Sequence, residues 1–84
     1  MNTDTTHPAL NAVHLGNNIK RLREILGKKQ QTLANELELS QQSISRFEAK
    51  EILDDALLNS LATALQITSD AVKNFREEPV EIVL

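Results

Sequence analysis

A short polar stretch in the middle of the chain carries side chains that could recognise another molecule by hydrogen bonding. Gln41, Gln42, Ser45 and Arg46 lie within six residues, and a helix over 41–49 places side chains four apart on one face. A glutamine amide can pair with adenine N6 and N7, and a guanidinium can pair with guanine O6 and N7. We therefore expect these four side chains to read base edges of double-stranded DNA in the major groove, with Gln42 and Arg46 as the principal readers.

The residues around this stretch predict two short helices joined by a tight turn. The first helix covers about 30–37, and Ser40 is well placed to accept from the free amides that begin the second. Apolar residues recur at helical spacing on the sides expected to be buried. These residues are Leu33, Ala34, Leu37, Ile44 and Phe47.

In its spacing this segment resembles the helix-turn-helix of phage-repressor-like regulators of the Xre/Cro type, from about Gly16 to Phe75. That family has a small residue where the second helix crosses the first, and Ala34 stands there. Ile44 stands where a branched residue fills the angle between the helices. Further matches are Leu22, Arg23 and Glu24 followed by Gly27, and Phe47 with Glu48.

The resemblance implies an all-α fold, a compact five-helix lambda-repressor-like DNA-binding domain. It also implies a structural ion pair between Arg23 and Glu48, and a role for Gln30 in holding the DNA backbone. Glu38 departs from the pattern, because the family commonly has glycine at this left-handed position. A non-glycine residue there costs on the order of 1 kcal/mol.

Several residues are candidates for contact with the DNA backbone. Lys28, Lys29 and Gln30 gather at a helix N-terminus, where free amides and the helix dipole favour an anion such as phosphate. Ser43 and Lys50 complete the predicted backbone set. The loop after the second helix contributes three carboxylates that would oppose phosphate, and these are Glu51, Asp54 and Asp55.

The rest of the domain is predicted to be helical and to supply the core. One helix begins near 15–17 and ends at Leu26, where Gly27 serves as a left-handed cap. Asp54 or Asp55 is expected to cap a helix that ends near residue 65, and Thr68 to cap the last one. The predicted apolar faces are Ile19, Leu22, Ile25 and Leu26, then Leu57, Leu58, Leu61, Ala62 and Leu65, then Ala71, Val72 and Phe75.

The predicted domain covers residues 15–76, and the two ends of the chain lack its helical pattern. Residues 1–14 lack periodicity and are interpreted as a flexible arm in which His7 and His14 are solvated. Residues 77–84 form an apolar tail, since Pro79 ends any preceding helix. Val80, Ile82 and Leu84 could pair across a two-fold axis, bind a partner protein or fold back onto the core.

Composition limits the possible functions of this 84-residue chain. It has no cysteine, two glycines and histidines only in the arm, so the sequence predicts no metal site, no cofactor and no enzymatic activity. With no apolar run long enough for a membrane span, a cytoplasmic protein is expected. The net charge of −3 is polarised, because residues 16–50 carry +3 and residues 51–84 carry −5.

The sequence favours a sequence-specific transcriptional regulator, of repressor type, that binds a palindromic operator as a homodimer. Two dimer-related recognition helices would lie about 34 Å apart, one turn of DNA. Two alternatives stay open. The chain could be the antitoxin of a toxin-antitoxin pair, or a protein-interaction module that keeps the fold without binding DNA.

Overall fold

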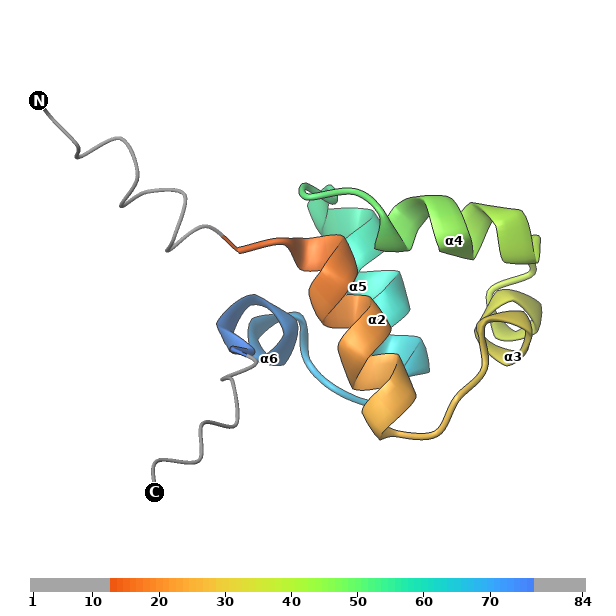
Figure 1. Cartoon of the computed structure of the whole chain (residues 1–84), viewed down its shortest axis with the longest axis horizontal. Helices are drawn as coiled ribbons and strands as arrows, with labels where there is room; N and C mark the ends of the chain where they lie inside the picture. Colours follow the sequence, from red (N-terminus) through yellow and green to blue (C-terminus); the bar gives the residue numbers. More distant parts are fainter. Residues whose placement is uncertain (1–12, 77–84) are drawn as a thin grey trace, which may run out of the picture.

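The computed structural model describes residues 13–76, and this part of the chain is a set of helices joined by short loops (Figure 1). Residues 13–76 contain no strand, so the predicted all-α class is confirmed. Residues 1–12 and 77–84, with His7 and the apolar tail, lie outside the described residues. The helices are α2 (Leu15–Ile25), α3 (Gln30–Glu36), α4 (Gln41–Glu48), α5 (Asp55–Ala64) and α6 (Ser69–Asn74).

The turn between α3 and α4 has the geometry that the sequence indicated. Glu38 has a φ of 57°, so the left-handed position is occupied by a glutamate. The amide of Leu39 donates to Ala34 O at 2.8 Å, and Ser40 Oγ accepts from Ser43 N at 3.1 Å. The capped first turn of α4 is therefore fixed against the end of α3.

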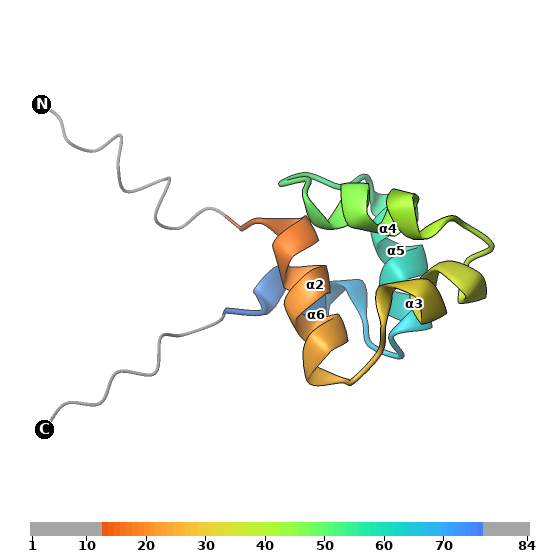
Figure 2. The same cartoon turned by 45° about the vertical axis from the view of Figure 1, so that its right-hand side comes forward.

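The core lies where the helices converge. α2 packs against α4 and α6, while α5 packs against α3 and α6 (Figure 2). Ala34 and Ile44 are fully buried at the crossing of α3 and α4, where a small and a branched side chain fit together. The remaining buried apolar residues are Ile19, Leu33, Leu53, Leu58, Leu61, Ala62, Leu65 and Val72.

Three residues predicted to be core are exposed. Ile25 and Leu26 retain 60% and 52% of their accessible surface, because α2 ends at Ile25 and its last turn projects past the core. Ala71 is also exposed, because the six-residue α6 turns only Val72 fully inward. Gly27, with a φ of 76°, ends this segment in the left-handed conformation expected for a cap.

His14 belongs to the folded domain. Its Nδ1 accepts a hydrogen bond from the amide of Asn17 at 2.9 Å, so the half-buried imidazole caps the N-terminus of α2. The interpretation of His14 as a solvated side chain of an arm is therefore wrong. The first turn of a helix has unsatisfied amides, and a side-chain acceptor just before it satisfies one of them.

The N-terminus of α2 closes directly onto the C-terminus of α4. The amides of Leu15 and Gly16 donate to Glu51 O and Lys50 O, each at 2.9 Å. The free donors of one helix thus satisfy carbonyls that follow the other. This approach requires a glycine, since a Cβ at Gly16 would lie 2.4 Å from both Lys50 O and Phe47 O.

Asn18 fastens the last helix to α2. Its buried side chain donates through Nδ2 to Val72 O at 2.8 Å and to Phe75 O at 3.1 Å. Val72 O also accepts from the amide of Phe75 at 3.3 Å, and Phe75 O belongs to the residue that caps the C-terminus of α6, so Asn18 adds bonds to carbonyls at this helix end. The sequence did not indicate this role, because an asparagine within a helix usually faces solvent.

We expect Gly16→Ala to lower the free energy of unfolding by about 3 kcal/mol or more, because its methyl group would force apart backbone atoms that cannot rotate away. Gly27→Ala is the matched control, since its Cβ would meet nothing within 4 Å and only the left-handed φ is strained. That change should cost about 1 kcal/mol. Urea denaturation measures both, and equal losses would contradict the close contact between α2 and α4.

Candidate nucleic-acid interface

The polar side chains predicted to read bases lie on the outside of α4. Gln41, Gln42, Ser45 and Arg46 are all exposed, whereas Ile44 on the opposite side of the helix is fully buried. Ile44 thus fixes the rotation of α4 about its own axis. A helix held in this way presents a row of donors and acceptors outward, and the major groove of DNA is wide enough to admit an α-helix.

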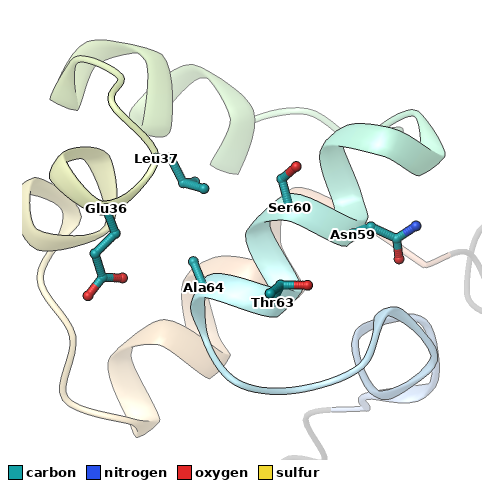
Figure 3. Close-up of a pocket in the computed structure, with 6 residues that line it drawn as sticks. All are labelled: Glu36, Leu37, Asn59, Ser60, Thr63 and Ala64. Atoms are coloured by element: carbon teal, nitrogen blue, oxygen red, sulfur yellow. The ribbon is translucent and has the colours of Figure 1, made fainter.

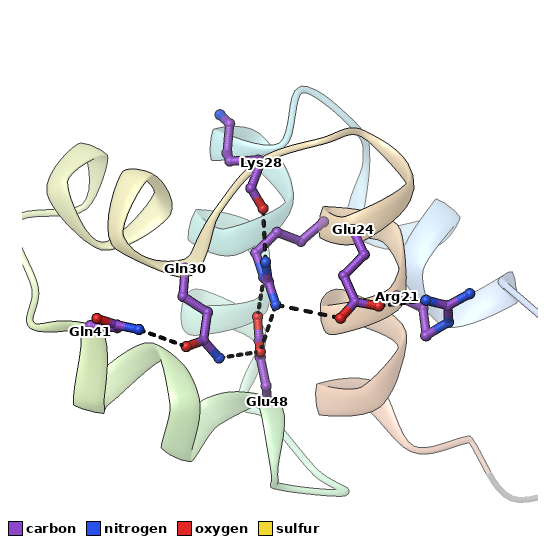
Figure 4. Close-up of polar contacts among 7 residues, drawn as sticks. Arg21, Glu24, Lys28, Gln30, Gln41 and Glu48 are labelled. Atoms are coloured by element: carbon purple, nitrogen blue, oxygen red, sulfur yellow. Dashed lines mark hydrogen bonds and ion pairs between the residues drawn. The ribbon is translucent and has the colours of Figure 1, made fainter.

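A buried ion pair lies beneath α4 (Figure 4). Arg23 of α2 donates through Nε to Glu48 Oε2 at 2.6 Å and through Nη2 to Glu48 Oε1 at 3.3 Å. Both residues are buried, with 7% and 5% of their surfaces exposed. The remaining guanidinium nitrogen, Nη1, donates to Lys28 O at 2.8 Å. The pair therefore joins the last residue of α4 to α2 and to the loop before α3.

Two glutamines extend this network to the surface. Gln30, the first residue of α3, donates through Nε2 to Glu48 Oε1 at 2.8 Å. Its Oε1 accepts from Gln41 Nε2 at 3.1 Å, so the first residues of α3 and α4 are linked (Figure 4). A continuous chain of hydrogen bonds therefore runs from the buried guanidinium of Arg23 to the exposed amide of Gln41 on α4.

The residues predicted to contact the DNA backbone do not all lie together. Lys28 Nζ donates to Glu36 Oε1 at 2.7 Å and to Ala64 O at 2.8 Å, so its ammonium lies at the C-terminal ends of α3 and α5. Gln30, at the N-terminal end of α3, is occupied within the network. Lys29 and Lys50 are exposed. Ser43 is half-buried beside the capping Ser40, with 3.0 Å between the two hydroxyl oxygens.

A small notch beside α4 brings one further cation, Lys20, to the exposed side of this helix. It has a volume of about 200 Å³ and lies between α2, α3 and the C-terminal half of α4. Lys20, Gln30, Ser45, Glu48 and Ala49 line it. The sequence favours a solvated side chain for Lys20 and leaves phosphate contact as the alternative. The structure places Lys20 near Ser45, at the edge of the exposed side of α4.

A larger hollow lies on another part of the molecule, between α3 and α5 (Figure 3). Its volume is about 420 Å³, and its lining residues are Glu36, Leu37, Asn59, Ser60, Thr63 and Ala64. Glu36 is the single titratable residue among them, and its carboxylate is bonded to Lys28. General acid-base chemistry uses a titratable side chain that is free to exchange a proton with the reacting group. These lining residues do not supply one.

Residues 13–76 also contain no cluster of three histidine, cysteine, aspartate or glutamate side chains able to hold a metal ion. Over the same residues, no helix has the length and apolar character required to span a membrane. The exposed side of α4 and the N-terminus of α3 carry the amide, hydroxyl and guanidinium groups that the sequence predicted to recognise DNA.

The helix-turn-helix family model matches residues 19–72, which is more than half of the chain. The chain belongs to this family, that of the Xre-type, phage-repressor-like regulators, and its class is that of DNA-binding regulators of transcription. Neither a curated protein nor a solved structure matches the chain.

We expect Arg23→Met to lower the free energy of unfolding by about 3–5 kcal/mol, because the carboxylate of Glu48 would stay buried without its cation. The double variant Arg23→Met with Glu48→Met should recover most of this loss. Arg21→Met is the matched control on the same helix, because the ion pair of Arg21 with Glu24 is exposed and is worth less than about 1 kcal/mol. An unchanged urea midpoint for Arg23→Met would show that the ion pair does not stabilise the fold.

Proposed function

We propose that this DNA-binding regulator is a repressor-type homodimer that reads a palindromic operator in the major groove through α4. One observation carries the proposal. The exposed side of α4 consists of amide, hydroxyl and guanidinium groups, while the opposite side is anchored in the core by Ile44. Gln41, Gln42, Ser45 and Arg46 are the proposed base readers.

The distribution of charge supports one orientation on DNA. Lys20, Lys29 and Lys50 are exposed around α3 and α4, in the half of the chain that carries +3. The acidic half, with Glu51 at its start, opposes phosphate and disfavours docking through the other side. Lys29 and Lys50 are the proposed backbone contacts whose side chains are exposed, and the half-buried Ser43, in the first turn of α4, is a third.

The homodimer follows from the size of the reading surface. A helix as short as α4, which covers Gln41–Glu48, reaches only a few base pairs, so a long operator requires a second copy. A two-fold dimer places two such helices about 34 Å apart on one face of the DNA. The apolar tail, with Val80, Ile82 and Leu84, is proposed to contact the second copy or a partner protein. A cytoplasmic location forms part of the same proposal.

Replacing both principal readers tests the proposal. Gln42→Ala with Arg46→Ala should abolish operator preference, because each bidentate base contact contributes about 1–3 kcal/mol of discrimination. Selection from random duplex DNA, followed by titration of the selected site, measures the effect. The unfolding midpoint should change little, since both side chains are exposed. Asn59→Ala, an exposed amide on α5, is the control. If the double variant selects the same sequence as the wild type, α4 is not the reading helix.

Salt dependence separates DNA binding from a protein-interaction module with the same fold. Neutralising Z phosphates releases counterions, so log K for duplex DNA should fall with a slope of about −0.9Z against log salt. Lys29→Ala should reduce this slope by about 1 and weaken binding equally for all sequences. A chain that shows no shift with any duplex in a gel, even at low salt, would instead be an interaction module.

A further inference from the structure

Two large apolar side chains at the C-terminal end of α2 are exposed in the described part of the chain. Ile25 and Leu26 retain 60% and 52% of their accessible surface. Ile25 lies about two helical turns beyond the buried Asn18. Leu26 lies at the same spacing beyond the buried Ile19. The exposed end of α2, by which we mean Ile25 and Leu26, therefore continues faces of this helix that are covered nearer its start.

The last helix holds the start of the C-terminal segment against α2. The carbonyl oxygen of Phe75, the residue that ends α6, accepts a hydrogen bond of 3.1 Å from Asn18 Nδ2. The backbone of Phe75 is extended, with a φ of −64° and a ψ of 129°. Ile25 lies about 10 Å farther along α2 than Asn18, since each helical residue rises about 1.5 Å. The chain that follows α6 thus starts beside the helix whose end is exposed.

The residues that follow α6 can span this distance. An extended chain advances about 3.3 Å per residue, so Val80 can lie as far as about 16 Å from Phe75. Side chains alternate along such a chain, so Ile82 joins Val80 on one side while Glu81 faces the other. An apolar edge of sufficient reach is therefore tethered next to an exposed apolar site.

We propose that the apolar tail docks on Ile25 and Leu26 of its own chain. Docking removes apolar surface of the tail and of α2 from water, which is the driving force for the contact. The short tether gives the tail an effective concentration on the order of millimolar at this site, about a thousand-fold above that of a second copy at micromolar concentration. Contact of the tail with a second copy or a partner protein therefore has to draw it away from α2.

The hollow between α3 and α5 suits the tail less well. Four of its six lining residues have polar side chains, and these are Glu36, Asn59, Ser60 and Thr63. Figure 1 shows α6 and α3 on opposite sides of α2, so the tail follows a helix that lies on the side of α2 away from α3. The exposed end of α2 is more apolar than the hollow and belongs to the helix that holds Phe75.

A double-mutant cycle tests the contact in the whole 84-residue chain. Ile25→Ser and Ile82→Ser should each raise the equilibrium constant for unfolding by about five-fold or more, because each change weakens the burial of apolar surface by the docked tail. Together they should raise this constant by at least about three-fold less than the product of the single effects, since both changes break one contact. Urea denaturation of the four proteins at low micromolar concentration measures the effect.

Ile52→Ser is the matched control, because Ile52 is an isoleucine with 79% of its surface exposed in the loop after α4. Its effect and that of Ile82→Ser should multiply within about two-fold. If the effects of Ile25→Ser and Ile82→Ser also multiply within about two-fold, the tail does not contact the end of α2 and the proposal is overturned. This result would leave the proposed function standing, because the measurement involves no DNA.

A spin label locates the tail directly. The chain has no cysteine, so Glu81→Cys provides a single attachment point for a nitroxide, on the side of the tail that faces away from α2. The amide signals of residues 25–27 should lose intensity in nitrogen-15 spectra, while those of residues 59–63 should keep it. The same protein with its nitroxide reduced is the reference.

A mixed sample separates the possible occupants of the site. In this sample the nitrogen-15 chains carry no spin label and the spin-labelled chains carry no nitrogen-15, so a loss of intensity comes from a second copy. The proposal predicts no loss at residues 25–27 in the mixed sample. A loss there would assign the site to a second copy. In the unmixed sample, a loss at residues 59–63 would place the tail in the hollow, and no loss at residues 25–27 would leave the tail for a partner protein. Each of these three results would overturn the proposal.

Discussion

The buried ion pair between Arg23 and Glu48 is the interaction on which the arrangement of the helix-turn-helix depends. Its guanidinium bonds to the last residue of α4 and to the carbonyl of Lys28, so α2, α4 and the loop before α3 meet at one point. Two charges removed from water require nearly all of their hydrogen-bonding capacity to be satisfied. That requirement admits few relative positions of the three segments, and so it sets where the exposed side of α4 lies.

Gly16 constrains the same end of α4 by a different kind of contact. Its amide donates to Lys50 O at 2.9 Å, so α2 holds α4 both through its N-terminal amides and through Arg23. The C-terminal end of α4 is therefore tied to α2. At the other end, Ser40 caps the first turn and Gln30 bonds to Gln41. With both ends fixed, the helix itself needs little reorganisation when its outward side chains contact a ligand, which lowers the entropic cost of binding.

The features that the sequence predicted well are those governed by local rules. The caps at Ser40, Asp54 and Thr68 follow from the hydrogen bonds that a helix start needs, and each side chain accepts from the expected amide. The left-handed residues Gly27 and Glu38 were also placed correctly, because a tight reversal permits few backbone conformations. The family match over residues 19–72 confirms the predicted class of fold.

The features that the sequence predicted poorly depend on where separate helices end and how those ends pack together. Periodicity puts Ile25 and Leu26 on an apolar face, but only the packed structure shows that this face extends past the core. Asn18 and His14 appeared to be ordinary polar residues until their partners, in α6 and in the first turn of α2, were placed beside them. Lys28 was grouped with Lys29 by sequence proximity, yet its ammonium bonds to the C-terminal end of α5.

The central claim is that the outside of α4, together with the start of α3, is the surface that meets DNA. The most direct measurement is a nuclear magnetic resonance titration of the 84-residue chain with a duplex obtained by selection. The account predicts the largest shifts in the amides and side chains of residues 41–46, with further shifts at Lys20, Lys29 and Gln30. Shifts confined to α5 and α6, with the signals of α4 unchanged at saturation, would contradict it.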